Sequence, residues 1–287
     1  MIKYQVKKNE DKKSIERILM SNFNIDRNSF YKALRKKDIK INGKRTSQNL
    51  ILKEADIIEA YIQLKDNIEY RKFYSVVFED ENILIVNKKQ GIPVINDSNN
   101  ELCLIDLINK DFNSNFELCH RLDRNTGGLL IISKNRNLTA EIKTEINNRF
   151  YNKIYKCIVW GNAENLIGVH KAWLFKDSNK NKVYIYKEKK NFSKEIITEV
   201  VNAKYNIENN TSEVDINLIT GRTHQIRAHM AFLGHFVIGD GKYGVNDVNR
   251  QMGYKYQTLW ACSLKPNVIS ENKVLPNINF IVQPEYE

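Results

Sequence analysis

The sequence predicts an α+β protein, with a small basic α/β domain followed by a larger domain built on a mixed or antiparallel sheet. Charge is spread unevenly, since residues 1–73 hold 18 Lys/Arg against 10 Asp/Glu and residues 74–287 hold 27 against 24. After residue 73, strand-like segments mix irregularly with a few helical ones, without the regular rhythm of a parallel α/β sheet. The 287 residues, 42% hydrophobic and 28% charged, suffice for the cores of two domains.

The first domain, residues 1–62, begins with two amphipathic helices. Ser14 can cap the first helix, because its hydroxyl can accept a hydrogen bond from an N–H group of the first turn. One face of this helix is apolar: Ile15, Ile18 and Leu19. Asn28 and Ser29 can cap the second helix in the same way. Its inward face consists of Phe30, Tyr31 and Leu34.

A hairpin and a last strand complete this domain. Residues 39–45 form a strand that enters an Asn-Gly pair, which is typical of a tight hairpin turn, and residues 56–61 form the closing strand. Residues 63–73 are polar and mixed in charge, so we interpret them as a linker. Basic side chains gather on the scaffold: Lys32, Arg35, Lys36, Lys37, Lys40, Lys44 and Arg45. We expect them to contact RNA phosphates, the alternative being a basic surface without a partner.

The larger domain, residues 74–287, is expected to combine several strands with few helices. Strand patterns occupy residues 74–79, 83–87, 129–133, 153–159 and 213–219. Helical patterns occupy residues 101–108, 138–146 and 223–233.

The strongest chemical signal is the segment HRLDRNTGGLL, residues 120–130. Its charged residues and two glycines precede a fully apolar strand, so the charged side chains should project at the end of the sheet. Taken alone, Asp123 would more often be a turn or capping residue than a catalytic one. The segment, however, resembles the HRLDxxTSG motif of the RluA family of pseudouridine synthases.

Further segments resemble the same family in the same order. They are NKKQGIPV (87–94), KIYKCIVWG (153–161) and LITGRTHQIRAH (218–229), followed by Gly239-Asp240 and Tyr243-Gly244. The resemblance spans roughly residues 74–265. Lys89 stands where the family usually has Pro, and Gly127 where it usually has Ser, which concerns local loop geometry. Residues 12–62 resemble the RNA-binding domain of ribosomal protein S-four.

The resemblance implies an isomerase that converts uridine in RNA to pseudouridine, with Asp123 as its catalytic carboxylate. This reaction breaks a carbon–nitrogen bond and forms a carbon–carbon bond without loss or gain of atoms, so we expect no cofactor and no metal. The resemblance also implies that Tyr155 stacks on the target uracil, its hydroxyl being a candidate proton acceptor. It implies that Arg121 fills the gap left by the everted nucleotide, although a phosphate contact is the alternative.

Arg227 is predicted to hold Asp123 in place. It lies beside the apolar face of the helix predicted over residues 223–233, where its guanidinium would be partly buried and need a carboxylate partner. We infer that this partner is Asp123, a structural ion pair with another acid being the alternative. Arg222 is expected to be a phosphate-binding or structural residue, and His224 a hydrogen-bonded structural imidazole.

Three other functions are less consistent with the sequence. Residues 239–244 fit the GxGxxG pattern of dinucleotide-binding enzymes, but we find no helical pattern after Gly244 and no acidic residue over positions 248–270. The spacing of His224, His229 and His235 does not place them on one helical face for a metal. The combined presence of Asp123, Tyr155 and Arg227, the three predicted catalytic residues, disfavours a non-catalytic RNA-binding protein.

Partners and location follow from the same observations. We expect an RNA substrate, with large-subunit ribosomal RNA favoured over transfer RNA. The longest aliphatic run, residues 129–132, is far shorter than the ~20 residues of a membrane span, and the N-terminus lacks the apolar core of a secretory signal. The cysteines include no CxxC pair: Cys103, Cys119, Cys157 and Cys262. We therefore expect a cytoplasmic monomer.

Overall fold

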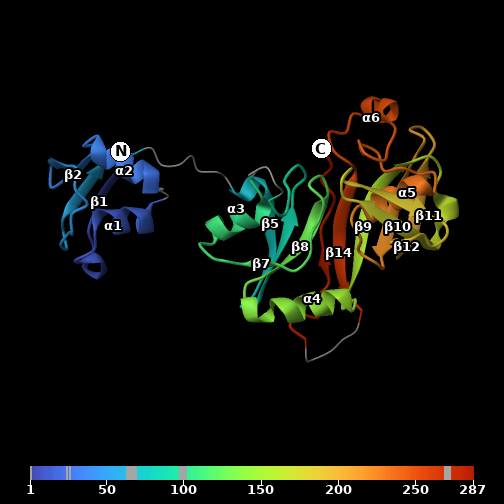
Figure 1. The fold of residues 1–287 in the computed structure, drawn as a ribbon, viewed down its shortest axis with the longest axis horizontal. Helices are drawn as coiled ribbons and strands as arrows, with labels where there is room; N and C mark the ends of the chain where they lie inside the picture. Colours follow the sequence, from blue (N-terminus) through green and yellow to red (C-terminus); the bar gives the residue numbers. More distant parts are fainter. Residues whose placement is uncertain (1, 24, 26, 63–69, 97–101, 268–272) are drawn as a thin grey trace. The chain divides into compact units, whose positions relative to one another are not determined.

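The chain forms two compact units, residues 1–69 and 70–287 (Figure 1). The computed structural model describes residues 2–23, 25, 27–62, 70–96, 102–267 and 273–287. Residues 63–69 of the expected linker lie outside this range. Residues 70–72 form the 3-10 helix η2 (Tyr70–Lys72) of the second unit. There Arg71 Nε lies 2.9 Å from Asp111 Oδ2, and the Arg71 guanidinium covers the Tyr74 ring.

The first unit packs two helices against a small antiparallel sheet. In spatial order its strands are β1 (Ile2–Gln5), β4 (Ile57–Ala60), β2 (Ile39–Ile41) and β3 (Lys44–Thr46). The sheet is accompanied by η1 (Lys8–Glu10), α1 (Ile15–Asn22) and α2 (Arg27–Arg35). Strand β1 was not predicted from the sequence. Fully buried side chains from both helices and the sheet form one core: Ile15, Ile18, Leu19, Phe30, Ile39 and Ile58.

The local signals of this unit were mostly interpreted correctly. Ser14 Oγ accepts a hydrogen bond from the Arg17 N–H at 3.2 Å, which confirms the first cap. Asn42 and Gly43 have φ of 50° and 80°, as the tight hairpin turn requires. The predicted cap of the second helix is wrong. The helix begins at Arg27, so Asn28 and Ser29 lie inside it, where the extended conformation of a capping residue is excluded.

The described part of the second unit contains an eleven-stranded sheet. Its spatial order is β11-β10-β12-β13-β9-β14-β8-β6-β5, with β15 paired to β14 and β7 to β8. The bounds are β5 (Tyr74–Glu79), β6 (Ile83–Lys88), β7 (Glu117–Leu118), β8 (Gly127–Ser133), β9 (Tyr151–Trp160), β10 (Gly168–Asp177), β11 (Lys182–Tyr186), β12 (Lys194–Asn206), β13 (Thr211–Leu218), β14 (Leu259–Pro266) and β15 (Phe280–Ile281). Strands β14 and β8 are parallel, and the other pairs are antiparallel, which confirms a mixed sheet.

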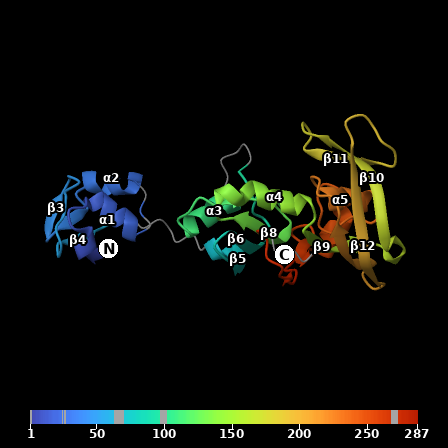
Figure 2. The same ribbon diagram turned by 90° about the horizontal axis from the view of Figure 1, so that it is seen from below.

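The helices of this unit are α3 (Leu104–Asp111), α4 (Thr139–Asn147), α5 (Gln225–Phe232) and α6 (Asn246–Met252). Figure 2 shows α3 and α4 on the same side of strands β5, β6 and β8. Helix α4 buries Ile142 and Ile146 in a core shared with β6, β8 and β14. Helix α5 buries Ala228 in a separate core on β10, β11 and β12. The predicted helices over residues 138–146 and 223–233 are therefore confirmed. The helix predicted over residues 101–108 begins later, at Leu104, and Glu101 lies outside the described residues.

The centre of the sheet brings distant parts of the sequence together. Ala261 of β14 is paired with Gly128 of β8 on one side and with Tyr155 of β9 on the other. Because neighbouring strands lie about 4.8 Å apart, the backbone at Tyr155 is only two strand spacings from the start of β8. The predicted HRLDRNTGG segment leads directly into that start, so the fold brings Asp123 and Tyr155 to the same region.

Gly127 has a packing reason to depart from the family's usual Ser. A Cβ at this position would lie 2.3–2.5 Å from three ring atoms of Trp260. The Trp260 ring is fully buried and its Nε1 donates to Asn87 Oδ1 at 3.2 Å. The indole therefore occupies the space that a serine side chain would need.

We predict that Gly127→Ser lowers the free energy of unfolding by about 1–3 kcal/mol through overpacking, measured by urea denaturation. Gly241→Ser is the matched control, because a Cβ there meets nothing within 4 Å, and it should change stability little. In a Trp260→Leu background the added cost of Gly127→Ser should shrink. An equal cost in both backgrounds would contradict this explanation.

Candidate active site

A pocket of about 760 Å³ opens in the second unit between the loop before β8, the start of β9 and the segment leading into α5. Asp123 is the only acidic residue among the described residues that line it. Five cationic side chains line the same pocket: Arg121, Arg149, Lys153, Arg222 and Arg227. The pocket therefore suits an anionic ligand that presents a reactive atom to a carboxylate.

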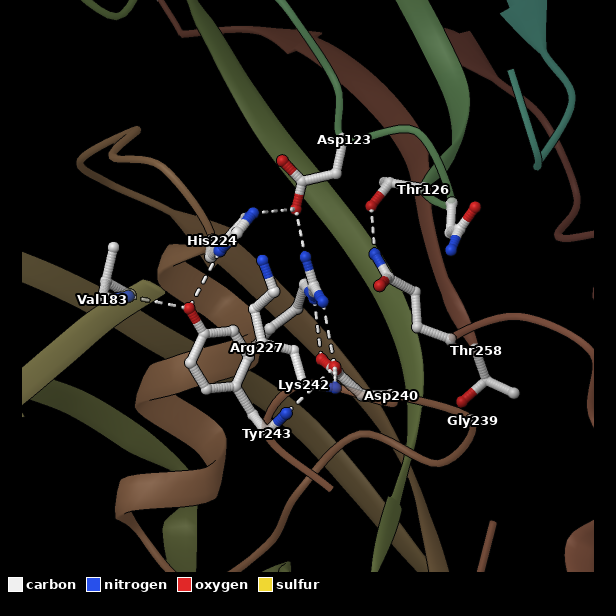
Figure 3. Close-up of polar contacts among 12 residues, drawn as sticks. Asp123, Thr126, Val183, His224, Arg227, Gly239, Asp240, Lys242, Tyr243 and Thr258 are labelled. Atoms are coloured by element: carbon white, nitrogen blue, oxygen red, sulfur yellow. Dashed lines mark hydrogen bonds and ion pairs between the residues drawn. The ribbon is translucent and has the colours of Figure 1, made fainter. Parts of the chain in front are cut away.

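Arg227 lies between two carboxylates (Figure 3). Its Nη1 donates to Asp123 Oδ2 at 2.8 Å. Its Nε and Nη2 donate to the two oxygens of Asp240 at 2.7 and 2.9 Å. The contact with Asp123 is the one inferred from the sequence, and the alternative of a second acid is present as well. Arg227 thus fixes the direction of the Asp123 carboxylate while being oriented by Asp240.

Asp240 was given no role by the sequence, although it follows the glycine of the recognised Gly-Asp pair. It is 1% exposed, and the backbone N–H groups of Lys242 and Tyr243 donate to its Oδ1 at 2.9 and 3.2 Å. Burial alone would raise the pKa of Asp240, but the hydrogen bonds and charge of Arg227, together with the two backbone hydrogen bonds, outweigh burial and hold the pKa below its ordinary value. Asp240 is therefore ionised and bonded at both oxygens.

The backbone that carries Asp123 is held from the opposite side. Lys88 Nζ, fully buried at the end of β6, donates to the carbonyls of Lys89, Arg124 and Thr126 at 2.8 Å each. The Thr126 N–H closes the turn by donating to the Asp123 carbonyl at 3.0 Å. Two buried glutamines complete the support, since Gln90 Nε2 donates to the Asn125 carbonyl and Gln257 Nε2 to Thr126 Oγ1. Buried side-chain donors therefore bond three successive carbonyls of the loop, those of residues 124–126.

Hydrogen bonds of the Gln225 side-chain amide hold the segment before α5 in place. Its Oε1 accepts from Thr220 Oγ1 and from the Arg222 N–H at 2.9 and 3.0 Å. Its Nε2 donates to the Ile197 carbonyl and to Thr198 Oγ1 of β12. The turn at residues 220–222 is thereby attached to the sheet, with the exposed Arg222 at the edge of the pocket.

His224 is a neutral, hydrogen-bonded imidazole, as the sequence suggested. Burial lowers the pKa of His224 to about 4, an effect that the Asp123 carboxylate opposes and Arg227 reinforces. Its Nδ1 lies 2.9 Å from Tyr243 Oη, which itself accepts from the Val183 N–H at 3.0 Å. Because His224 Nε2 faces the Asp123 carboxylate, the imidazole proton is favoured on Nε2, and Nδ1 then accepts the proton of Tyr243. The 3.9 Å separation between His224 Nε2 and Asp123 Oδ2 is then not an ion pair.

Tyr155 lies on the buried face of β9 with Cys157 and Val159, as expected, and lines the pocket. Burial raises the pKa of its hydroxyl, and the Asp123 carboxylate raises that pKa further. The phenol is therefore neutral at physiological pH. Arg121 lines the pocket as an exposed side chain.

The basic residues predicted for RNA lie on the first unit, away from this pocket in sequence. Six of them are exposed: Lys32, Arg35, Lys36, Lys37, Lys44 and Arg45. Lys37 has a left-handed backbone at the end of α2, and its carbonyl accepts a 3.4 Å hydrogen bond from Arg45. The hairpin and the helix end therefore present their cations together.

Residues of the GxGxxG segment, 239–244, contact Arg227 and His224. Our expectation of no helix after Gly244 is wrong, since α6 spans residues 246–252. The residues preceding the segment, however, belong to no strand, and Val237 makes only an isolated bridge to Val159. Its Asp240 and Tyr243 contact Arg227 and His224 instead.

The three histidines considered for a metal make separate contacts. His224 contacts Tyr243, His229 contacts Thr198 and His235 contacts the Trp160 carbonyl. Within the described ranges no group of three or more metal-ligating side chains is found. No helix in those ranges combines the length and apolar character of a membrane span.

Comparison with known proteins shows the family of this chain. Residues 82–232 match the RNA pseudouridylate synthase family. The chain is 31% identical over 264 residues to an RNA pseudouridine synthase of Mycoplasma genitalium, covering 84% of this chain and 81% of that one. It is 32% identical over 259 residues to the ribosomal large subunit pseudouridine synthase C of Buchnera aphidicola, covering 85% and 81%.

Two further comparisons concern substrate and fold. The tRNA pseudouridine(31) synthase of Saccharomyces cerevisiae is 34% identical over 186 residues, covering 59% of this chain and 46% of that one. The structure of human RNA pseudouridylate synthase domain containing 1 superimposes with a TM-score of 0.60 at 23% identity, covering 73% of this chain and 83% of that one. At this identity the likeness shows a shared fold and nothing about the reaction.

The family match over residues 82–232 gives the class of this protein, an enzyme that acts on RNA. The chain belongs to the RNA pseudouridylate synthase family and is of the RluA type, so it is an isomerase. The resemblance recognised in the sequence is thereby confirmed for the catalytic domain.

We predict that Asp240→Asn lowers the free energy of unfolding by about 3 kcal/mol, because it leaves a buried guanidinium partly uncompensated. Since the pKa of Asp240 is lowered by folding, its contribution is present above about pH 4 and lost as the pH falls through its folded-state pKa. Asp240→Asn should therefore show a flatter acid side in its stability profile, measured by denaturation from pH 3 to 7. Asp247→Asn, an exposed partner of Arg250, should resemble the wild type. A wild-type profile for Asp240→Asn would contradict this role.

Proposed function

We propose that this enzyme isomerises uridine in large-subunit ribosomal RNA, with Asp123 as the reacting carboxylate. The observation that carries the proposal is the 2.8 Å bond from Arg227 to Asp123, the one acid among the described residues of the pocket. Within the described residues the other oxygen of Asp123 forms no hydrogen bond with a side chain, and the Asp123 side chain is 21% exposed. A carboxylate oriented on one side and accessible on the other is suited to react with a bound sugar.

The chemistry requires a carboxylate at the ribose. The bond between C1′ and N1 of the uridine breaks, the uracil turns over, and a bond between C1′ and C5 forms. The proton leaves C5 and N1 gains one, so the mass is unchanged. Asp123 either attacks C1′ or stabilises a charged or deprotonated sugar intermediate. Because Arg227 is shared with Asp240, its charge is partly neutralised in advance, and Asp123 keeps its capacity to react.

We assign the stacking position on the uracil to Tyr155. An aromatic ring that lines the pocket, as Tyr155 does, can hold the base while the glycosidic bond is broken. Burial and Asp123 both raise the pKa of its hydroxyl. A phenol that resists ionisation is a poor proton acceptor, which supports stacking over removal of the C5 proton.

Two arginines at the rim are assigned to the RNA around the target. Duplex or stacked RNA hides the glycosidic carbon, so the uridine must leave the stack. Arg121 lies two residues before Asp123 and is exposed, so its planar guanidinium can enter the vacated space. Arg222, exposed on the turn held by Gln225, is assigned to a phosphate.

Ribosomal RNA is favoured by how far the relatives match. The Buchnera large-subunit enzyme is matched over 85% of this chain, first unit included in part, whereas the yeast tRNA enzyme is matched over 59%. The exposed cations of the first unit support its role as an RNA-binding domain like that of ribosomal protein S-four.

We propose that the enzyme acts in the cytoplasm as a monomer, without a metal or cofactor. Mapping pseudouridines in total RNA with and without the gene identifies the target.

We predict that Asp123→Asn abolishes pseudouridine formation while leaving RNA affinity within about twofold of wild type, since the isosteric amide cannot act as a nucleophile. Pseudouridine is detected by chemical derivatisation of RNA. Asp215→Asn, a partly exposed partner of Lys156 on β13, should retain activity. Near-wild-type turnover by Asp123→Asn would overturn the assignment.

We predict that neutralising Lys36, Lys37 and Lys44 with glutamine reduces the salt dependence of RNA binding. Removing one lysine–phosphate interaction should lower the slope of log affinity against log salt by about 0.7–0.9. The control is glutamine at Lys180, Lys187 and Lys190, which are exposed on the second unit. Equal slopes for the two triple variants would rule out the first unit as the electrostatic anchor.

A further inference from the structure

Lys153 lies on the same face of β9 as Tyr155, two residues earlier in the strand. Residues two apart in a strand are separated by about 6.6 Å and point to one side of the sheet. Both side chains line the pocket that contains Asp123. Lys153 and Tyr155 therefore leave the strand on the same side, and their side chains are neighbours in the pocket.

The Lys153 ammonium has no counter-charge in the part of the chain that the structure describes. Within those ranges it takes part in no ion pair or hydrogen bond, whereas Lys156, on the opposite face of the same strand, lies 3.7 Å from Asp215. Asp123, the one acid among the described pocket residues, is bonded to Arg227. The neighbouring His120 accepts a hydrogen bond from the Ile131 N–H at 3.0 Å, and burial lowers its pKa to about 3. His120 is therefore neutral and supplies no counter-charge to Lys153.

An ammonium in this position costs free energy in the unbound enzyme. Burial lowers the pKa of Lys153 from its ordinary value, which means that the surroundings disfavour its charge. Buried or half-buried charges are normally paired, because water no longer solvates them fully. A residue kept in such a state is explained when a ligand brings the missing anion.

We infer that Lys153 binds a backbone phosphate attached to the ribose of the everted uridine. The inference rests on the proposed function, because it takes Tyr155 and Asp123 as the sites of the uracil and of C1′. The phosphates of a nucleotide are joined to the same ribose that Asp123 must reach, so they fall within the reach of a lysine side chain placed beside Tyr155.

Small nucleotides test this site without requiring the natural RNA. We would measure the affinities of uridine, uridine 5′-monophosphate and uridine 3′-monophosphate by NMR titration for the wild type, Lys153→Gln, Lys153→Arg and Lys156→Gln. In the wild type at least one monophosphate should bind about tenfold more tightly than uridine, as a charge-assisted hydrogen bond allows. The preference should disappear in Lys153→Gln, return at least partly in Lys153→Arg and persist in Lys156→Gln. The monophosphate concerned tells whether the 5′ or the 3′ phosphate is bound.

Thermal unfolding separates this role from a structural one. Removing an unpaired charge should leave the melting temperature of free Lys153→Gln equal to or above that of the wild type. A clearly lower melting temperature, a phosphate preference that survives Lys153→Gln, or the absence of any preference in the wild type would each overturn the inference. The proposed function fails separately, by the absence of pseudouridine in RNA treated with the wild-type enzyme.

Discussion

The site depends on one guanidinium held between two carboxylates. Asp240 engages Arg227 through two parallel bonds, and this fork leaves Nη1 directed at Asp123. A lysine could not replace it, because an ammonium lacks the planar geometry that binds one acid with two nitrogens and points a third at another. Asp240 therefore acts on Asp123 through Arg227, and the direction of the Asp123 carboxylate depends on a residue that does not line the pocket.

The backbone of Asp123 is constrained as strongly as its side chain. Lys88 uses all three ammonium donors on carbonyls around the loop, two of which, Arg124 and Thr126, follow Asp123. Buried glutamines from the β6 end and from the segment before β14 add further bonds. The loop is thus held by strands that are neighbours in the sheet, and the side chain is held by α5. Such support from strands and a helix keeps the Asp123 carboxylate in place without help from a ligand.

The pocket contrasts two kinds of cation. Arg227 is fully paired and organises the acid, whereas Lys153 lines the pocket without a counter-charge among the described residues. Paired cations stabilise the free protein, and unpaired ones become favourable only with an anionic ligand. The excess of positive charge over acid in the pocket therefore reflects a substrate whose backbone carries the balancing charge.

Local signals in the sequence sufficed for the fold class, for most strands near residues 120–130 and for the Ser14 cap, because periodicity, caps and an Asn-Gly turn act over a few residues. The importance of residues 120–130 was inferred from their resemblance to a family. Strands β10, β11 and β12 were missed, since apolar residues such as Val169, Ile185 and Val201 also occupy exposed or half-buried positions and obscure the alternation. The contact of Arg227 with Asp123, 104 residues apart, followed from a need for charge compensation. The second acid, the Tyr243–His224 bond and the Lys88 clamp did not, because only the folded sheet decides which buried donors and acceptors meet.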